Sequence, residues 1–347
     1  MFARGVDGML RRRMTRRPLP LLALALVTLT TARARAIGIE QYHEQAPGTG
    51  GAQIDDRPAS ERRVTVTLDT VLGWGNGSIA QLVNARSSPP RPITVIVDKG
   101  RYVESFLPSV QARITREFSV GVMLPFTFMS FTTDDGRRLG AAALGNLIVG
   151  GAWSPASTPW TVSLALGAPT AQGTPPSGTD TAPLDASEEN GINRLYAQDG
   201  AARSRGLENL APWAYKRWSL TPKLAGAWTL PSMPLTLGAA LQVENLIDAG
   251  GGAPDKWALR TTPSVRASWS FGWLDASLRS WVAIPITRAQ TADGYSYYER
   301  GATWAVEPSV RASYERISGL VGVIVPVAKP AGDPRYFGLR LVFGVLF

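Results

Sequence analysis

One stretch of sequence decides the fold: residues 257–270 read WALRTTPSVRASWS. Its odd-numbered positions are mostly apolar, with tryptophan near both ends, and its even-numbered positions are mostly polar or basic. Side chains alternate between the two faces of a β-strand, so this pattern predicts a strand with one apolar and one polar face. Two further segments, 218–228 and 304–314, repeat the pattern with an aromatic residue at each end.

The spacing of these aromatic residues predicts that the strands cross a membrane. Two residues about ten positions apart, on a strand rising ~3.3 Å per residue and tilted ~40°, are separated by roughly 25 Å along a membrane normal. A transmembrane β-barrel has an apolar band about that tall between two aromatic girdles. A soluble sandwich with tryptophan in its core is the alternative. The predicted girdle consists of Trp218, Trp228, Trp257, Trp269, Trp304, Tyr314 and Phe347.

The remaining chain extends this pattern to an all-β fold. About twelve segments of alternating apolar and polar residues follow one another, and their connections alternate between short and long. Short periplasmic turns and longer extracellular loops are typical of a transmembrane antiparallel β-barrel. The longest predicted loop is 169–212. Every second residue from Phe337 to Phe347 is apolar, so we expect Phe347 to complete the last strand and to be read by the barrel-assembly machinery.

The N-terminal region predicts export. Five arginines between Arg11 and Arg17 precede an apolar run at 19–29, and Ala34-Arg35-Ala36 follows as a small-residue cleavage signal. This order is typical of a secretory signal peptide. A membrane anchor is the alternative, but the run has about half the ~20 residues that a spanning helix needs. We therefore expect a signal peptide at 1–36, a flexible periplasmic tail at 37–62 and a barrel at 63–347.

Composition excludes several kinds of site. The chain has 347 residues, no cysteine and one histidine, His43, and its mean hydropathy of -0.03 is far below that of a helical membrane protein. Disulfides and Cys-based or His-based metal sites are excluded, and we expect no cofactor. Hydrolytic sites normally need a histidine base beside a nucleophile, and His43 lies ahead of the first strand. We therefore expect no enzyme, although carboxylate pairs remain possible.

The polar faces of the predicted strands gather charge. Cations outnumber anions there, which favours a lumen that prefers anions or amphiphiles, because clustered charge concentrates counter-ions. The alternative is that these groups pair with one another and fill the barrel. The cations alternate with lipid-facing residues, so no nucleic-acid surface is expected. The predicted lumen-lining residues are Arg113, Arg217, Lys223, Arg260, Arg266, Arg279, Arg311, Arg340, Asp69, Glu244, Asp275 and Glu307.

Residues 103–170 resemble one family of barrels. The segments GVMLPF at 121–126, GAAALGNL at 140–147 and LALGAPT at 164–170 are similar to strands of the outer-membrane transporters of the "MetA-pathway of phenol degradation" group. Asn146 stands where that family usually has Asp, and Ala168 where it has Leu. The resemblance implies an outer-membrane channel without naming a substrate.

Together these observations predict a bacterial outer-membrane barrel with lipid and small-molecule solutes as partners. The expected function is passive passage of small molecules, either apolar or anionic. The second hypothesis is a non-conducting structural or surface-binding barrel whose loop 169–212 meets a partner. The tyrosines at 295, 297 and 298 and the aromatic residues around Trp213 could contact an apolar substrate or pack against the girdle and loops.

Overall fold

The structure is a computed structural model that describes residues 64–78, 82–84, 91–93, 97–132, 138–156, 158–173, 186–250, 256–287, 302–328 and 335–347. The expected signal peptide, the expected tail and the tyrosine-rich segment 294–298 lie outside the described residues. Among the helices that the structure describes, none is long and apolar enough to cross a membrane.

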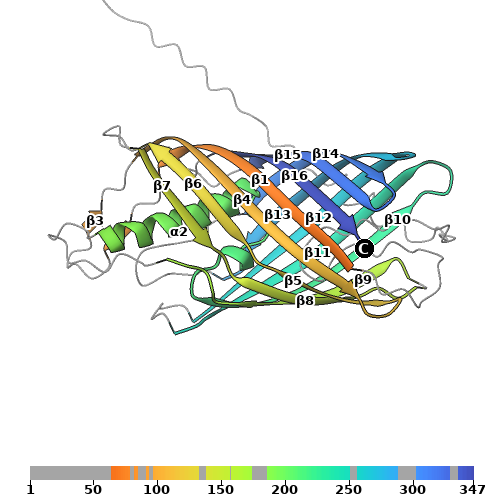
Figure 1. Ribbon diagram of the computed structural model, residues 1–347, viewed down its shortest axis with the longest axis horizontal. Helices are drawn as coiled ribbons and strands as arrows, with labels where there is room; N and C mark the ends of the chain where they lie inside the picture. The colour runs from red at the N-terminus through yellow and green to blue at the C-terminus, as the bar shows by residue number, and fades with distance from the viewer. Residues whose placement is uncertain are drawn as a thin grey trace, which may run out of the picture. The chain divides into compact units, whose positions relative to one another are not determined.

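The described chain is dominated by one antiparallel sheet (Figure 1). Its strands are β1 (Val64–Ser78), β4 (Val97–Arg113), β5 (Phe118–Met123), β6 (Phe126–Thr132), β7 (Arg138–Leu144), β8 (Leu147–Trp153), β9 (Trp160–Ala168), β10 (Arg217–Thr229), β11 (Leu235–Asp248), β12 (Trp257–Phe271), β13 (Leu274–Pro285), β14 (Thr303–Tyr314), β15 (Ile317–Ala328) and β16 (Arg335–Leu346). A separate small hairpin joins β2 (Leu82–Asn84) to β3 (Arg91–Ile93).

The sheet closes on itself, because β1 pairs with β16 on one side and with β4 on the other. β5 and β6 both pair with β4, one after the other along its length, so together they count as one strand of the barrel. In the same way, β8 pairs with β5 and β7 pairs with β6, so β7 and β8 together form the next strand. The result is a closed barrel of twelve strands, as the sequence predicts. The turns at 114–117, 154–159, 230–234, 272–273 and 315–316 gather at one end, which we call the short-turn end.

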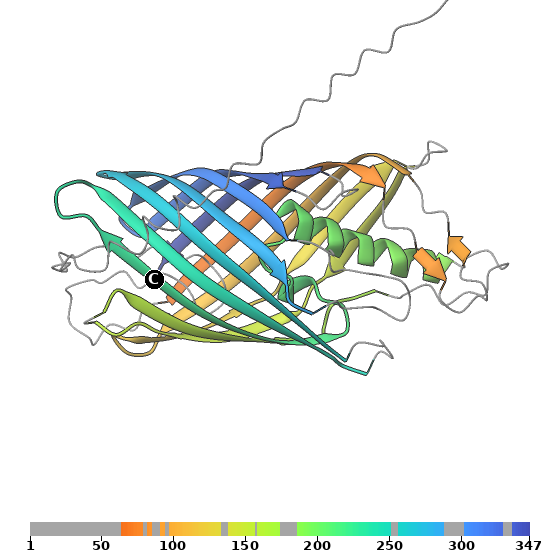
Figure 2. The same ribbon diagram turned by 180° about the vertical axis from the view of Figure 1, so that it is seen from behind.

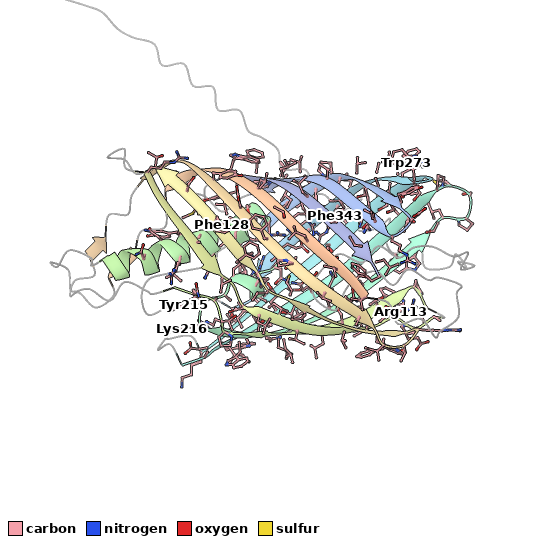
Figure 3. The ribbon with its side chains drawn as sticks, in the orientation of Figure 1. Arg113, Phe128, Tyr215, Lys216, Trp273 and Phe343 are labelled. Carbon is pink, nitrogen blue, oxygen red and sulfur yellow. The ribbon has the colours of Figure 1, made fainter. Side chains whose placement is uncertain are left out.

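Burial alternates along the strands as the sequence pattern requires. In β9 every second residue is buried, and the residues between them are exposed on the outer face. The outer face carries large apolar side chains such as Phe128, Val265 and Phe343, which Figure 3 shows pointing away from the barrel at the labelled positions 128 and 343. This outer apolar surface is what a barrel presents to lipid.

The wall has one interruption. β5 and β6 are separated at Leu124-Pro125, and β7 and β8 at Gly145-Asn146. Proline has no N–H to donate to a strand ladder, so Pro125 accounts for the first break. Of the described strands, β7 pairs only with β6, so its other edge has no strand beside it.

A helical segment occupies the interior. Helix α2 (Ala186–Ser204) and the short 3-10 helix η1 (Ala211–Trp213) come from the connection between β9 and β10. Figures 1 and 2 both show α2 running into the barrel from the end opposite the short turns. The sequence predicted 169–212 only as a long loop, and we call its inner part, residues 186–213, the plug.

Candidate functional site

The plug packs directly on the barrel wall. Helix α2 contacts β1, β4, β6, β7 and β16. Its small residues allow the close approach: Ala197, Ala201 and Ser204 are fully buried. A Cβ atom added at Gly73 would collide with the Cβ of Ser204, and one at Gly338 would collide with the Ser204 carbonyl oxygen. Glycine on the wall and small residues on the helix therefore bring the two backbones together.

The chain turns sharply where α2 ends. Gly206 has a φ of 64°, in the left-handed region that glycine adopts at little cost. The side chain of Trp281 on β13 donates from Nε1 to the Gly206 carbonyl oxygen at 3.0 Å. The same indole packs in a small buried cluster with Val71, Ala305 and Ile324. The turn is therefore anchored to β13 by a hydrogen bond and to β1, β14 and β15 by apolar contacts of the same indole.

Asp69 on β1 is the centre of the main ion-pair network. The plug residue Arg205 donates to its carboxylate at 3.0 Å, and Arg340 on β16 donates to it at 3.0 and 3.2 Å. Arg205 also donates to the Ser105 hydroxyl at 2.9 Å and to two wall carbonyl oxygens. Asp69 is 2% exposed, and buried charges of this kind persist only when paired and hydrogen-bonded.

The network continues around the barrel. Arg340 donates to Glu307 on β14 at 3.1 and 3.3 Å, and Arg279 on β13 lies 3.6 Å from the same carboxylate. Arg279 also donates through both terminal nitrogens to the plug residue Glu208. The plug therefore contributes one cation and one anion to a chain of charges that runs across four wall strands.

A separate carboxylate holds the end of the plug. Glu244 on β11 accepts hydrogen bonds from the backbone N–H groups of Leu210 at 2.8 Å and Ala211 at 3.1 Å. Arg260 on β12 donates to its other oxygen at 3.0 Å. Both oxygens of this fully buried carboxylate are thus occupied, one by the plug and one by the wall.

Two amide side chains join the plug to the interruption in the wall. Asn146 donates from Nδ2 to the carbonyl oxygens of Ala211 and Ala214, both at 2.8 Å, and accepts from the Ala171 N–H at 3.0 Å. Gln198 of α2 donates to the carbonyl oxygen of Leu144, at the end of β7, at 3.1 Å. The break between β7 and β8 is therefore filled by plug contacts where strand pairing stops.

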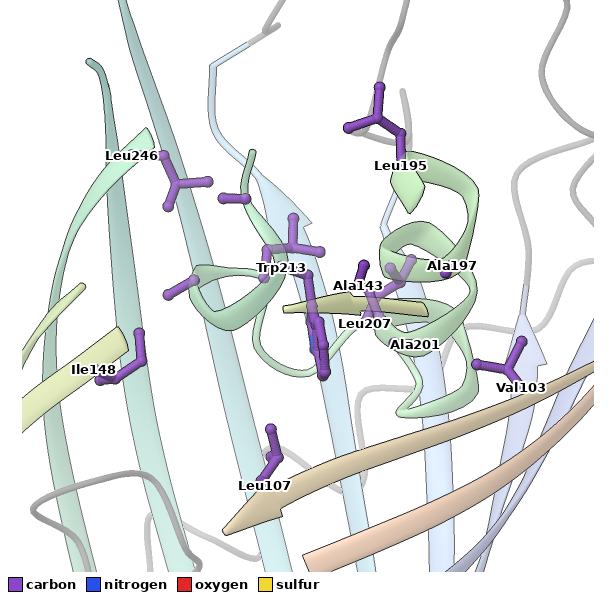
Figure 4. Packing of buried hydrophobic residues seen from close by; sticks show 14 of the residues in the cluster. Val103, Leu107, Ala143, Ile148, Leu195, Ala197, Ala201, Leu207, Trp213 and Leu246 are labelled. Atoms are coloured by element: carbon purple, nitrogen blue, oxygen red, sulfur yellow. The ribbon is translucent and has the colours of Figure 1, made fainter. Parts of the chain in front are cut away.

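A buried apolar cluster lies between the plug and this part of the wall. Figure 4 shows Trp213 between α2 and the strands that carry Leu107 and Ile148. Met123 and Met129 belong to the same cluster. Each strand from β4 to β8, where the interruption lies, contributes a residue to the cluster, which also reaches Leu246 on β11 and Tyr336 on β16.

Most of the predicted lumen-lining residues have side chains buried inside the barrel. Nine of the twelve have buried side chains: Asp69, Arg217, Lys223, Glu244, Arg260, Asp275, Arg279, Glu307 and Arg340. Arg113, Arg266 and Arg311 are half-buried, and Figure 3 shows Arg113 at the opposite end of the barrel from Lys216. The structure brings Asp69, Arg279, Glu307 and Arg340 into one network and pairs Glu244 with Arg260. Pairing, the second of the two sequence interpretations, accounts for these charges.

The predicted girdle residues lie on the outer face. Trp218, Trp257, Trp269, Trp304, Tyr314 and Phe347 are exposed there, and Trp228 is partly covered because its ring packs edge-on against Trp160.

Sequence reasoning missed four residues that complete the site: Arg205, Glu208 and Gln198 of the plug, and Asn146 at the break in the wall. The first three lie in a stretch without strand alternation, so no pattern assigned them to the interior. Asn146 did stand out as a departure from the family pattern.

Comparisons with known proteins agree with the barrel. No family model and no curated protein matches the chain. Among solved structures, the COG4313 outer membrane channel from Pseudomonas putida F1 matches with a TM-score of 0.52 and 12% identity, over 88% of this chain and 100% of that one. The toluene transporter TbuX of Ralstonia pickettii gives a TM-score of 0.42 at 11% identity, over 87% and 96% of the two chains.

The resemblance of 103–170 to the "MetA-pathway of phenol degradation" barrels is thereby confirmed at the level of the fold. The twelve-stranded closure, the apolar outer face and this likeness point to the same place in the cell. The protein is an antiparallel β-barrel of the bacterial outer membrane, with the fold of the COG4313 channel.

Proposed function

We propose that this protein is an outer-membrane channel for passive passage of small molecules with an apolar body. The observation that carries the proposal is the coincidence of two features. The buried apolar cluster around Trp213 includes residues from each of β4 to β8, the part of the wall whose strand pairing is interrupted, and extends from there to other strands. A solute that dissolves in the membrane has an apolar surface to contact at this place.

The charges of the lumen support an apolar solute over a simple anion. Five arginines (Arg205, Arg260, Arg279, Arg340 and the helix residue Arg203) are bound to carboxylates. Paired charges attract counter-ions less than the unpaired ring that anion selectivity requires. The plug also lies in the lumen against β1, β4, β6, β7 and β16, so we expect it to hinder water-filled passage.

The second hypothesis is a non-conducting or surface-binding barrel. Most residues between Leu195 and Trp213 are buried against the barrel, so this part of the long connection is not available to an external partner. The dense docking of the plug is the one observation that favours a structural barrel without passage.

Uptake of toluene separates these functions. The barrel is produced in a Gram-negative host whose lipopolysaccharide surface slows the entry of apolar solutes, and an unrelated outer-membrane barrel is the control. We expect faster toluene accumulation than in the control strain. In liposomes, we expect little swelling with a small sugar, since the plug lies in the lumen and hinders passage of water-soluble molecules. Equal toluene uptake in both strains would rule out the proposed channel.

A further inference from the structure

We propose that the lumen contains a binding site for a carboxylate, formed by Lys223, Gln242 and Thr262. The solute that it takes is a monocarboxylate with an apolar body. This proposal rests on the proposed channel function and adds a substrate class to it.

The three residues form a row across neighbouring strands. Lys223 on β10 lies directly opposite Gln242 on β11, and Gln242 lies directly opposite Thr262 on β12. Ser163 on β9 extends the row on the other side of Lys223. Residues directly opposite each other in an antiparallel pair carry their side chains on the same face, about 5 Å apart at Cβ. All four side chains are more than nine-tenths buried, on the inner face.

Donors of this row lack acceptors within the part of the chain that the structure describes. The Gln242 Nε2 and the Thr262 hydroxyl are buried without a hydrogen-bond partner there, as are the hydroxyls of Ser219 and Thr221 on β10. Folded proteins rarely leave buried polar groups unpaired, because each one has lost its hydrogen bonds to water. Four such groups on adjacent strands indicate that something else supplies the acceptor.

The carboxylates nearby are already bound. Glu244 accepts from Arg260, Leu210 and Ala211, and Glu208, whose charge acts on Lys223, is bound by both terminal nitrogens of Arg279. The row itself supplies an ammonium group, an amide N–H₂ and hydroxyl groups. A carboxylate matches this set, because it accepts several hydrogen bonds and carries the opposite charge to Lys223.

The apolar cluster borders these unpaired donors, which accounts for the apolar body of the solute. Its member Ala165 on β9 lies directly opposite Thr221 on β10, two residues from Lys223 on the same face. Further along β10, Ile148 and Ser219 meet at Gly167, where an added Cβ would lie 2.9 Å from the Ile148 Cδ1 and would collide with the Ser219 hydroxyl. Ile148 belongs to the cluster with Leu107, Met123 and Trp213 (Figure 4). The donors and the apolar wall therefore border each other inside one barrel.

Binding of benzoate and of its uncharged counterpart, benzyl alcohol, tests the site. Calorimetry on the purified full-length barrel in detergent is expected to show that benzoate binds more tightly than benzyl alcohol. Lys223→Met should weaken benzoate at least tenfold and leave benzyl alcohol unchanged. Lys256→Met is the matched control, because Lys256 is an exposed lysine on the same barrel, and it should leave both affinities unchanged.

A second variant distinguishes loss of the binding site from loss of folding. Gln242→Glu keeps the side-chain size and places a negative charge in the row, so benzoate affinity should again fall at least tenfold. Heat-modifiable gel migration establishes that each variant is folded. Equal affinity of wild type for the two ligands, or unchanged benzoate affinity in folded Lys223→Met and Gln242→Glu, would overturn the site. In that case toluene uptake by wild type still decides the proposed channel separately.

Discussion

At the scale of single residues, Arg205 is the strongest link between plug and wall. Its guanidinium makes four hydrogen bonds, to Asp69 and Ser105 on two neighbouring strands. Removing one partner of a buried ion pair typically costs about 3–5 kcal/mol when the other charge is left unpaired; Asp69 keeps Arg340, so we expect a smaller loss here. The ion pair between Arg203 and Asp199 joins two residues of the same helix, so its loss leaves the contacts of Arg205 with the wall in place.

We therefore predict that Arg205→Met releases the plug. Single-channel recordings in planar bilayers should show larger or more frequent openings than wild type. Arg203→Met is the control, since Arg203 pairs with Asp199 inside α2. The control should conduct like wild type. Identical recordings from Arg205→Met and wild type would mean that this contact does not hold the plug.

The sequence predicted the wall charges but not their partners. Alternation along the strands assigned Asp69 and Arg340 to the inner face, and both are buried there. Arg205 follows a helix, where the period of two does not apply, so nothing in the local pattern placed it against Asp69. The contact joins residues far apart in the chain and depends on how the connection folds back.

At the scale of elements, the strands were predictable and the plug was not. Strands facing lipid on one side and a polar interior on the other must alternate, and the sequence records that alternation. Helix α2 packs on β1, β4, β6, β7 and β16 through a mixture of small, apolar and polar residues, so its sequence shows no regular apolar stripe. Its buried face consists of small residues such as Ala197, Ala201 and Ser204, which are common in loops as well.

Removing the plug should leave the barrel intact. Replacing residues 186–213 with a short Gly-Ser linker deletes no strand and none of the pairing that closes the sheet. We expect the deletion protein to keep heat-modifiable migration and to conduct ions at a much higher level than wild type. Liposome swelling with a small sugar should rise in parallel. A deletion protein that folds yet stays closed would show that the plug is not the barrier.

At the scale of the whole molecule, the outer apolar surface determines where the barrel is stable. Val265 lies in the middle of β12 and is 46% exposed, whereas Phe271 ends the same strand beside a short turn. The cost of a charge on the lipid face depends on depth, from about 2–4 kcal/mol at the midplane to about 0–1 kcal/mol near the interface.

Val265→Arg should accordingly lower the free energy of unfolding by about 2–4 kcal/mol, and Phe271→Arg by about 1 kcal/mol or less in its electrostatic part. Urea unfolding of the barrel in lipid vesicles, followed by tryptophan fluorescence, measures both. Equal losses at the two positions would contradict the predicted membrane level of β12.

Of the two breaks that interrupt the wall, the sequence offers a local reason for the first but not for the second. Pro125 in the segment GVMLPF has no N–H for a strand ladder, and β5 ends before it, whereas Pro263 and Pro308 lie within paired strands. The matching break at Gly145-Asn146 depends on Asn146 turning its amide towards the plug, and no alternation predicts that contact.

The placement of Arg205 bears on how the barrel is assembled. Asp69 lies on β1 and Arg340 on β16, the strands that meet where the sheet closes, and Arg205 comes from the middle of the chain. The carboxylate of the first strand is thus bound by one cation from the last strand and one from the interior. A plug already inside the barrel would offer this seam a charge to form around. We therefore expect mutants of Arg205 to insert into lipid vesicles more slowly than wild type, as timed by heat-modifiable gel migration, because they lose a contact that the plug shares with both ends of the sheet.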